Sequence, residues 1–345
     1  MKVTIKQPAL AQLTKDVCGL SDQKHPLFEG VLISASVGNL TLCARGYVAE
    51  RVAEHLDDVV LEEGAALVNA VRFNKVVQAL DKTKDVTLEV KDDALQVRSG
   101  RSRFKLQLIT NEYTPLLKKG KLHTQVFIGD MLDKVKHAAA KHDVRYFLNG
   151  FNVDVDHEEQ TVSLVATDGH RISVVTESLA SPVEQSGSYI VPRDVLAHIG
   201  QTVAFNDQDQ VISGGVTAQL VGGTFPDWRR VMPAYGDINI EVGKDDMLGA
   251  INRVQTVNED ASNRLIITFQ RDKITLSNDK ATEDIDASMH KLTGGDFKVG
   301  FNSAYIVDVL NTLDDDKVAM SFTSETSAML ITEGNARHVV MPMRL

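Results

Sequence analysis

The stretch FKVGFNSAYIVDVLNTL, residues 297–313, has the pattern of a short strand that runs directly into a helix. Two other stretches have the same design, AALVNAVRFNKVVQAL at 65–80 and SYIVPRDVLAHIG at 188–200. Alternating apolar and polar residues, typical of two or three half-buried strands, follow each of them. The chain therefore carries an internal repeat, and a repeat decides how every other motif is interpreted.

Each of these three stretches is preceded in the chain by a related segment, in which a predicted helix is followed by strands. Apolar residues at helical spacing occur in PALAQLTKDVCGL at 8–20, in GDMLDKVKHAAAKH at 129–142 and in KDDMLGAINRVQTVN at 244–258. Alternating strands follow each of these predicted helices, and the whole pattern recurs after about 115 residues. The sequence thus predicts about six copies of one unit, paired into three domains at 1–121, 122–236 and 237–345. Polar connectors near 118–121 and 234–237 fall at these boundaries.

The predicted fold is of the α+β class, because runs of strands predominate and helices do not alternate strictly with them. We expect three similar domains, each with two helices packed on antiparallel sheets.

Composition excludes several classes of protein. The chain has 345 residues, of which 43% are hydrophobic and 24% charged, as in a packed globular protein. No apolar run approaches the roughly 18 residues that span a bilayer, so we expect a cytoplasmic protein without a membrane partner. Two cysteines, Cys18 and Cys43, are too few for a disulfide scaffold and are expected to be reduced core residues.

Charge is distributed unevenly along the chain. The net charge of -10 argues against a general binder of polyanions. Residues 1–121 hold 18 Lys and Arg against 15 Asp and Glu, whereas residues 237–345 hold 11 against 18. A basic first third and an acidic last third predict either head-to-tail association or a local basic surface on an acidic body.

The usual motifs of nucleotide hydrolysis and zinc proteases are absent, and we expect neither a metal nor a cofactor. The most enzyme-like stretch is ATDGHR, 166–171, in which Asp168 and His170 could form an acid/base pair on one face of a strand. The alternative is an Asp-Gly turn beside a surface strand. No nucleophile or ligand cluster lies nearby in sequence, which favours the turn.

Basic segments recur on the predicted helices and give a more specific signal. Residues 134–146 contain lysines, histidines and Arg145, while Arg72 and Lys75 lie on the helix at 70–80. Such residues often form only a solvated helix face, but their recurrence on equivalent helices favours a shared basic surface. A further cluster, VRSGRSRFK at 97–105, has the pattern of a sheet edge.

Six stretches together resemble the bacterial sliding clamp family, the beta subunit of DNA polymerase III. They are VRSGRSRF (97–104), DVRYFLNG (143–150), ATDGHRI (166–172), FPDWRRVMP (225–233), VGFNSAYIVDVLNTL (299–313) and VVMPMRL (339–345). They are specific in combination and span nearly the whole chain. The resemblance implies a non-enzymatic head-to-tail homodimer whose six domains close a ring around duplex DNA. It also implies that the ring tethers a polymerase.

The resemblance further implies that the polymerase and the clamp loader dock short apolar peptides in a groove between the second and third domains. Carried over residue by residue, this groove comprises Arg145, Phe147, Leu148, Thr167, Gly169, His170, Arg171, Ile172, Pro226, Arg230, Val231, Asn302, Tyr305, Val339, Val340, Met341, Pro342, Met343 and Arg344.

Two other surfaces complete the predicted sites. We expect sequence-independent DNA contacts from cations that face the hole, namely Lys24, Arg72, Lys75, Lys134, Lys136 and Lys141. We expect the dimer to join a basic first-domain edge to an acidic third-domain edge through Arg72, Arg98, Arg101, Arg103, Phe104, Thr256, Val257, Glu283, Asp284 and Asp286. The alternatives are a clamp-like protein that binds peptides without closing on DNA, and a hydrolase that uses Asp168 and His170.

Overall fold

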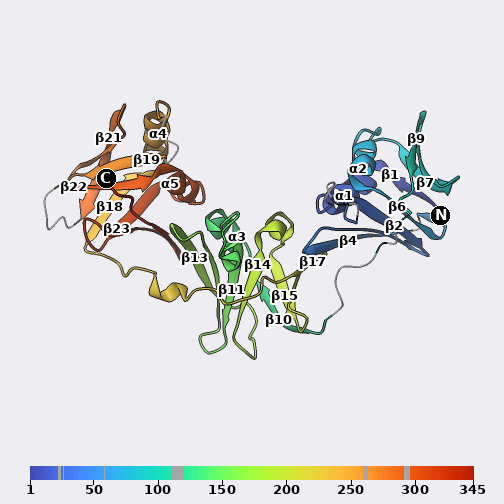
Figure 1. The fold of residues 1–345 in the computed structure, drawn as a ribbon, viewed down its shortest axis with the longest axis horizontal. Coiled ribbons are helices and arrows are strands. Elements are labelled where there is room, and N and C mark those ends of the chain that lie inside the picture. The colour runs from blue at the N-terminus through green and yellow to red at the C-terminus, as the bar shows by residue number, and fades with distance from the viewer. Residues whose placement is uncertain are drawn as a thin grey trace. The chain divides into compact units, whose positions relative to one another are not determined.

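Figure 1 presents the computed structural model of the chain. The structure describes residues 1–21, 25, 27–57, 59–110, 113, 120–258, 263–290 and 296–345. The chain divides into two compact units. Unit 1 comprises Met1–Gln125 and Ala197–Leu220, and unit 2 comprises Val126–Leu196 and Val221–Leu345.

Unit 1 is built on two antiparallel sheets. Their strand orders are β5-β1-β7-β8-β9 and β10-β15-β16-β17-β4-β3-β2-β6. The elements are β1 (Lys2–Lys6), α1 (Gln7–Cys18), β2 (Gly30–Ser36), β3 (Asn39–Arg45), β4 (Ala49–Leu56), β5 (Val60–Glu62), β6 (Gly64–Asn69), α2 (Ala70–Gln78), β7 (Asp85–Lys91), β8 (Ala94–Ser99), β9 (Ser102–Gln107), β10 (Leu122–Phe127), β15 (Thr202–Asn206), β16 (Gln210–Ser213) and β17 (Val216–Gln219).

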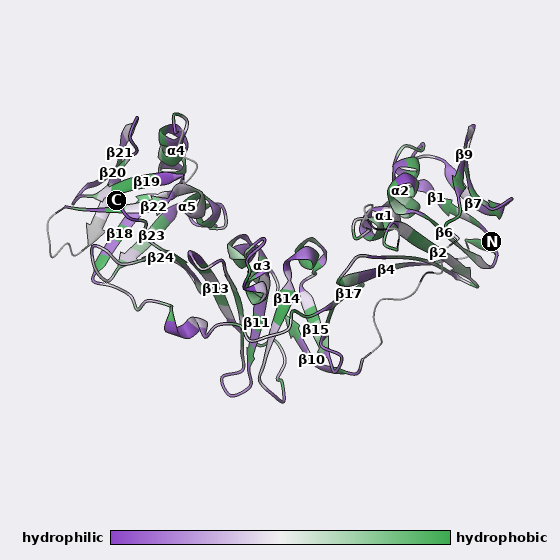
Figure 2. Cartoon of the chain, in the orientation of Figure 1, coloured by the Kyte–Doolittle hydropathy of each residue, from purple (hydrophilic) through white to green (hydrophobic). Residues whose placement is uncertain are grey.

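The two helices of unit 1 lie side by side, and each buries one face (Figure 1). The buried residues recur at helical spacing, with Leu10, Leu13 and Val17 on α1 and Phe73 and Val77 on α2. Figure 2 shows the mixed hydropathy of both helices. Burial of these faces against the strands makes one core, as the helix-and-strand pattern predicted. Both cysteines are buried and free.

Unit 2 contains a single sheet with the strand order β14-β11-β12-β13-β25-β24-β23-β18-β21-β20-β19-β22. The elements are α3 (Met131–Val135), β11 (Gly150–Asp156), β12 (Thr161–Thr167), β13 (Arg171–Ser178), β14 (Gly187–Pro192), β18 (Ile238–Gly243), α4 (Lys244–Gln255), β19 (Arg264–Phe269), β20 (Lys273–Ser277), β21 (Thr282–His290), β22 (Phe297–Asn302), α5 (Ser303–Leu310), β23 (Lys317–Phe322), β24 (Met329–Glu333) and β25 (Ala336–Val340). The 3-10 turns are η1 (Lys136–Ala138), η2 (Tyr146–Leu148), η3 (Arg193–His198) and η4 (Trp228–Arg230).

The sheets, the helices and their order confirm the α+β class. The helices expected at 129–142 and after residue 192 are much shorter than the sequence indicated: α3 has 5 residues, and η3 is a 3-10 turn. Side chains from elsewhere in the chain donate hydrogen bonds to carbonyl oxygens that a longer helix would pair with its own amides. Arg171 donates to the carbonyl of His137 at 2.6 Å, and Arg193 donates to that of Ala139. Tertiary hydrogen bonds thus end the helix where the apolar spacing would have continued it.

One long connector crosses unit 2 between β17 and β18, with η4 as its regular element. It appears in yellow to orange in Figure 1. In the part of the chain that the structure describes, no helix has the length and apolar character needed to cross a membrane.

Candidate functional site

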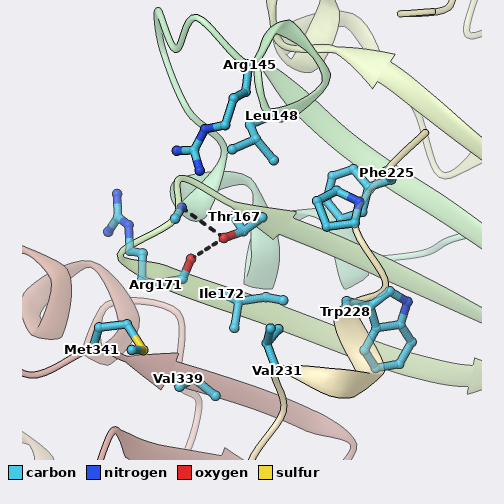
Figure 3. Close-up of a pocket in the computed structure, with 12 residues that line it drawn as sticks. Arg145, Leu148, Thr167, Arg171, Ile172, Phe225, Trp228, Val231, Val339 and Met341 are labelled. Atoms are coloured by element: carbon cyan, nitrogen blue, oxygen red, sulfur yellow. Dashed lines mark hydrogen bonds between the residues drawn. The ribbon is translucent and has the colours of Figure 1, made fainter. Parts of the chain in front are cut away.

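A pocket of about 450 Å³ opens on unit 2 where β13, β25 and the connector meet. Its walls are mainly apolar (Figure 3). The lining residues are Arg145, Leu148, Thr167, Gly169, Arg171, Ile172, Phe225, Pro226, Trp228, Val231, Val339 and Met341. A concave, largely apolar site with a few polar groups is the usual form of a ligand or peptide pocket.

The first wall is the turn between β12 and β13. Thr167 Oγ1 donates to the carbonyl of Arg171 at 2.7 Å and accepts from the amide of Gly169 at 3.1 Å (Figure 3). Gly169 has φ +87°, a left-handed conformation that disfavours other residues, and the space for a side chain is taken by Arg145. The turn is therefore tightly specified by its own residues.

The side chain of Asp168 is engaged within this turn. Its carboxylate accepts from the amides of His170 at 2.9 Å and Arg171 at 3.1 Å, and it pairs with the Arg171 side chain. The ring of His170 instead stacks on Tyr305, with centroids 6.4 Å apart. These contacts favour the turn interpretation of ATDGHR over an acid/base pair of Asp168 and His170. Among the described residues, no group of three or more His, Cys, Asp or Glu could hold a metal ion.

The second wall is β25, which comes from the far end of the chain. β13 and β25 pair antiparallel, and this register places Ile172 opposite Val339. The amide of Met341 then donates to the carbonyl of His170 at 2.9 Å. Because both strands are buried within one sheet, their side chains hold one side of the pocket rigidly.

The connector forms the third wall. Phe225 is buried, whereas Val231 is 60% exposed and stands over the pocket beside Ile172 (Figure 3). Trp228 lies between them in sequence and packs against a buried apolar cluster below the pocket, which includes Phe225, Ile172 and Val339. An apolar side chain with this exposure at a pocket mouth is available to a ligand.

Two arginines lie at the polar side of the pocket (Figure 3). Arg145 makes a bidentate pair with Asp143, with nitrogen–oxygen distances of 2.9 and 2.7 Å, and these bonds lower the pKa of Asp143 to about 2. Arg171 is held by Asp168, by Asp308 at 2.6 Å and by the ring of Tyr305 at 4.4 Å. Arg145 is half-exposed and can meet a ligand, while Arg171 is mostly engaged within the protein.

The structure thus brings together the expected groove residues Arg145, Leu148, Thr167, Gly169, Arg171, Ile172, Pro226, Val231, Val339 and Met341. Pro342, Met343 and Arg344 instead line a neighbouring pocket of about 400 Å³ beside β22. Val340 is fully buried, Asn302 caps α5, and Tyr305 packs on Arg171. Phe147 packs on the apolar cluster below the pocket, and Arg230 is paired with Asp227.

Sequence reasoning missed Phe225 and Trp228, although both lie in the quoted stretch FPDWRRVMP. Their signal was the pair of large aromatic residues, three positions apart, in a connector with no strand pattern. A buried ring in an irregular segment needs a partner surface, and the pocket is that surface.

The expected DNA-facing cations differ in their surroundings. Arg72 and Lys75 are exposed on α2, and Lys141 is exposed in the loop after η1. Lys136 pairs with Asp133, and Lys134 lies 2.8 Å from Glu333 and 3.0 Å from Asp314. Lys134 therefore connects α3 to the turn after α5, and the two carboxylates already neutralise its charge. Lys24 lies outside the described residues.

Six of the expected dimer residues lie on β9, on β21 or in the turn before β9, whereas Arg98 lies on β8, Arg72 lies on α2, and Thr256 and Val257 follow α4. β9 is the last strand of its sheet, and Phe104 on it is 39% exposed, which agrees with the predicted edge. β21 pairs with β20 along Thr282–Asp286, while β18 covers only its later residues. The charge pattern differs from the expected one, because Glu283 already pairs with Arg253, and Asp284 with Lys273.

Three family models together match nearly all of the chain. They are described as the N-terminal, central and C-terminal domains of the DNA polymerase III beta subunit, and they match residues 1–118, 121–227 and 229–344.

Individual relatives and solved structures agree with the family models. The chain is 28% identical to the beta sliding clamp of Vibrio cholerae and 29% identical to that of Escherichia coli, each match covering 100% of both chains. It resembles the crystal structure of the DNA polymerase III subunit beta from Pseudomonas aeruginosa with a TM-score of 0.89 and 26% identity. A sliding clamp from Bartonella birtlesii bound to griselimycin gives 0.90 and 25%, and both structural matches also cover 100% of each chain.

Proposed function

The chain belongs to the DNA polymerase III beta subunit family, the bacterial sliding clamps, which are non-catalytic processivity factors of DNA replication, and from this premise we propose how it works. Two copies associate head to tail and close a ring of six domains around duplex DNA in the cytoplasm. We place the domain boundaries near residues 121 and 236; the three family models support a division into three domains, with ranges that meet near residues 120 and 228.

Partner proteins bind to the ring at the pocket on unit 2. The observation that carries this proposal is the apolar pocket of about 450 Å³, which is assembled from three distant parts of the chain. Leu148, Ile172, Val231 and Met341 are apolar anchors, and buried anchors of this kind supply most of the affinity at peptide interfaces. The occupant is a short apolar peptide of the polymerase or of the clamp loader.

DNA is held without sequence preference. Exposed cations on helices and loops, namely Arg72, Lys75, Lys136 and Lys141, contact phosphates. Lys136 stays accessible although it pairs with Asp133, whereas Lys134 is left out because it is mostly buried and two carboxylates neutralise it. Phosphate contacts carry no base information, so a ring that uses only these can slide. Weak, salt-dependent contacts suit a protein whose retention on DNA is topological.

The dimer forms between the free edge of β9 and the Thr282–Asp286 part of β21, which β18 does not cover. Unpaired edge strands are templates for pairing with another chain. Exposed ion pairs contribute only about 0–1 kcal/mol each, and two of the three acidic residues already have partners. The stability of this interface therefore depends mainly on strand pairing and on Phe104 and Val257.

The test is retention on DNA of two topologies. Protein loaded on a nicked circle stays bound at moderate salt, and it leaves within minutes once the circle is cut, because a ring can slide off the ends. Equal retention on both forms contradicts encirclement. If DNA is never retained but a clamp-binding peptide binds the pocket, the alternative of a peptide-binding protein that does not close on DNA is correct.

A further inference from the structure

The connector that forms the third wall of the pocket has very few polar anchors. From Gly222 to Met232, every hydrogen bond that it makes to the rest of the described chain ends on one carboxylate, that of Asp154. Its next bonds are at its ends, where Val221 donates to the carbonyl of Ile190 and Pro233 accepts from Arg337. An irregular segment with so few bonds depends on each of them for its position.

Asp154 contacts the connector at two adjacent residues. Its Oδ2 accepts from the indole Nε1 of Trp228 at 2.9 Å and from Arg229 Nη1 at 2.7 Å. The Arg229 guanidinium in turn lies over the Trp228 ring, 4.4 Å from the ring centre. The indole is thus held at its polar edge and covered on one face, and its remaining surface lines the pocket.

Asp154 is well suited to this role because its own position is fixed. It lies in the middle of β11, where it pairs with Ser163 of β12 on one side and Ser188 of β14 on the other. Its side chain is mostly buried, with 18% exposed, so its bonds to Trp228 and Arg229 are partly shielded from water. Hydrogen bonds to a charged group are roughly twice as strong as neutral ones.

We propose that Asp154 is a positioning residue for partner binding, which sets the aromatic wall of the groove by holding Trp228 in place. This inference rests on the proposed function, since it takes the pocket to be the site where the partner peptide binds. Asp154 itself does not line the pocket. Its effect on partners is therefore indirect and passes through the indole.

Trp228 is the only tryptophan in the chain, so its fluorescence reports this contact directly. The experiment compares wild-type protein with Asp154→Ala and Asp154→Asn. Acrylamide quenching of the free protein measures the exposure of the indole, and calorimetry with a short clamp-binding peptide that contains Gln and Leu measures affinity. Glu241→Gln is the matched control, because it removes a carboxylate that pairs with Lys317 at 2.6 Å outside the pocket.

We expect Asp154→Ala to increase quenching and to weaken peptide binding at least tenfold, because the indole loses its hydrogen bond to a charged group. Asp154→Asn keeps an oxygen that can accept from the indole, so it should restore wild-type quenching and bring affinity to within about threefold of wild type. Unchanged quenching in Asp154→Ala, or equal loss of affinity in both variants, overturns the proposal. Failure of the wild-type protein to bind the peptide refutes the proposed groove, while the quenching comparison still decides the role of Asp154.

Discussion

Arg171 donates to the carboxylate of Asp308 at 2.6 Å, and this pair joins the β13 strand to helix α5. The two residues are 137 positions apart in the sequence. The same guanidinium donates to the carbonyl of His137 at 2.6 Å and lies over the ring of Tyr305. One side chain thus connects the turn beside the pocket with two helical segments.

Replacing Arg171 should therefore destabilise unit 2. Arg171→Gln leaves a part-buried carbonyl and carboxylate without their donor, which should cost about 1–3 kcal/mol of unfolding free energy in urea titrations. Asp308→Asn should cost less, because Asp308 is 44% exposed. Arg230→Gln is the control, since the Arg230 side chain is 84% exposed and pairs only locally with Asp227. Equal stability of Arg171→Gln and Arg230→Gln would show that the network is not needed.

Removal of Met341–Leu345 should abolish one wall of the groove without unfolding the protein. The deletion removes the Met341 side chain and two backbone hydrogen bonds, to His170 and to Gly300, but leaves β25 intact. Peptide affinity should fall at least tenfold, or about 1.4 kcal/mol, in calorimetry. The truncated protein should remain a dimer by light scattering.

A shorter deletion, of Arg344 and Leu345 alone, is the control for this truncation. Neither residue lines the larger pocket, so affinity should stay close to that of the full chain. Unchanged affinity in the longer deletion would place the partner site elsewhere.

Phe104→Arg should convert the dimer to monomers at micromolar concentration. The substitution puts a charge at the free edge of β9, where an apolar contact is expected, and next to Arg103. Multi-angle light scattering after gel filtration gives the mass directly. Phe127→Arg serves as the control, because Phe127 is 51% exposed on β10 and lies outside the proposed interface. A dimeric Phe104→Arg protein would rule out this interface.

Lys75 and Lys134 should respond differently to loss of charge. Lys75→Gln removes an exposed cation, so binding to a short duplex should weaken and its salt dependence should drop by about one unit of slope. Lys134→Gln should leave DNA binding unchanged and lower stability instead, because Glu333 and Asp314 lose their partner. Identical salt slopes for Lys75→Gln and wild type would remove Lys75 from the DNA-facing set.

A buried histidine, His338, and a partly buried one, His137, should make unit 2 sensitive to acid. Ser173 Oγ lies 3.1 Å from His137 Nε2 and 2.9 Å from His338 Nδ1. Burial, together with the nearby charge of Arg171, lowers the pKa of His137 to about 4, and burial lowers the pKa of His338 to about 3. Both are therefore neutral in the folded protein, whereas in the unfolded chain they protonate near pH 6.5.

The unfolded state thus binds more protons in this range, so stability is complete above pH 6.5 and falls as the pH drops toward 3. His338→Gln should flatten this decline in urea titrations between pH 7 and pH 4. The variant His157→Gln is the control, because His157 is exposed. A decline of the same steepness in the wild-type and His338→Gln proteins would contradict the assignment.

The local spacing of apolar and polar residues was sufficient to predict many elements of the fold. Helix-spaced apolar residues such as Leu10, Leu13 and Val17 predicted α1, and the alternation in 97–105 predicted the edge strand that carries Phe104. The Asp-Gly pair in ATDGHR predicted a turn. These features depend on residues only a few positions apart, so the spacing of apolar and turn residues in the sequence is enough to predict them.

The sequence by itself determined the repeating strand-and-helix units, the α+β class and, through motifs spread over the chain, the family. Only the tertiary structure decided where α3 ends, that Lys134 is paired, and that Phe225 and Trp228 belong to the pocket. The register that sets Ile172 opposite Val339, and the bond from Trp228 to Asp154, join segments far apart in the chain. Periodicity specifies which face of a segment is buried, but the partner of that face depends on packing between distant segments, which local spacing does not encode.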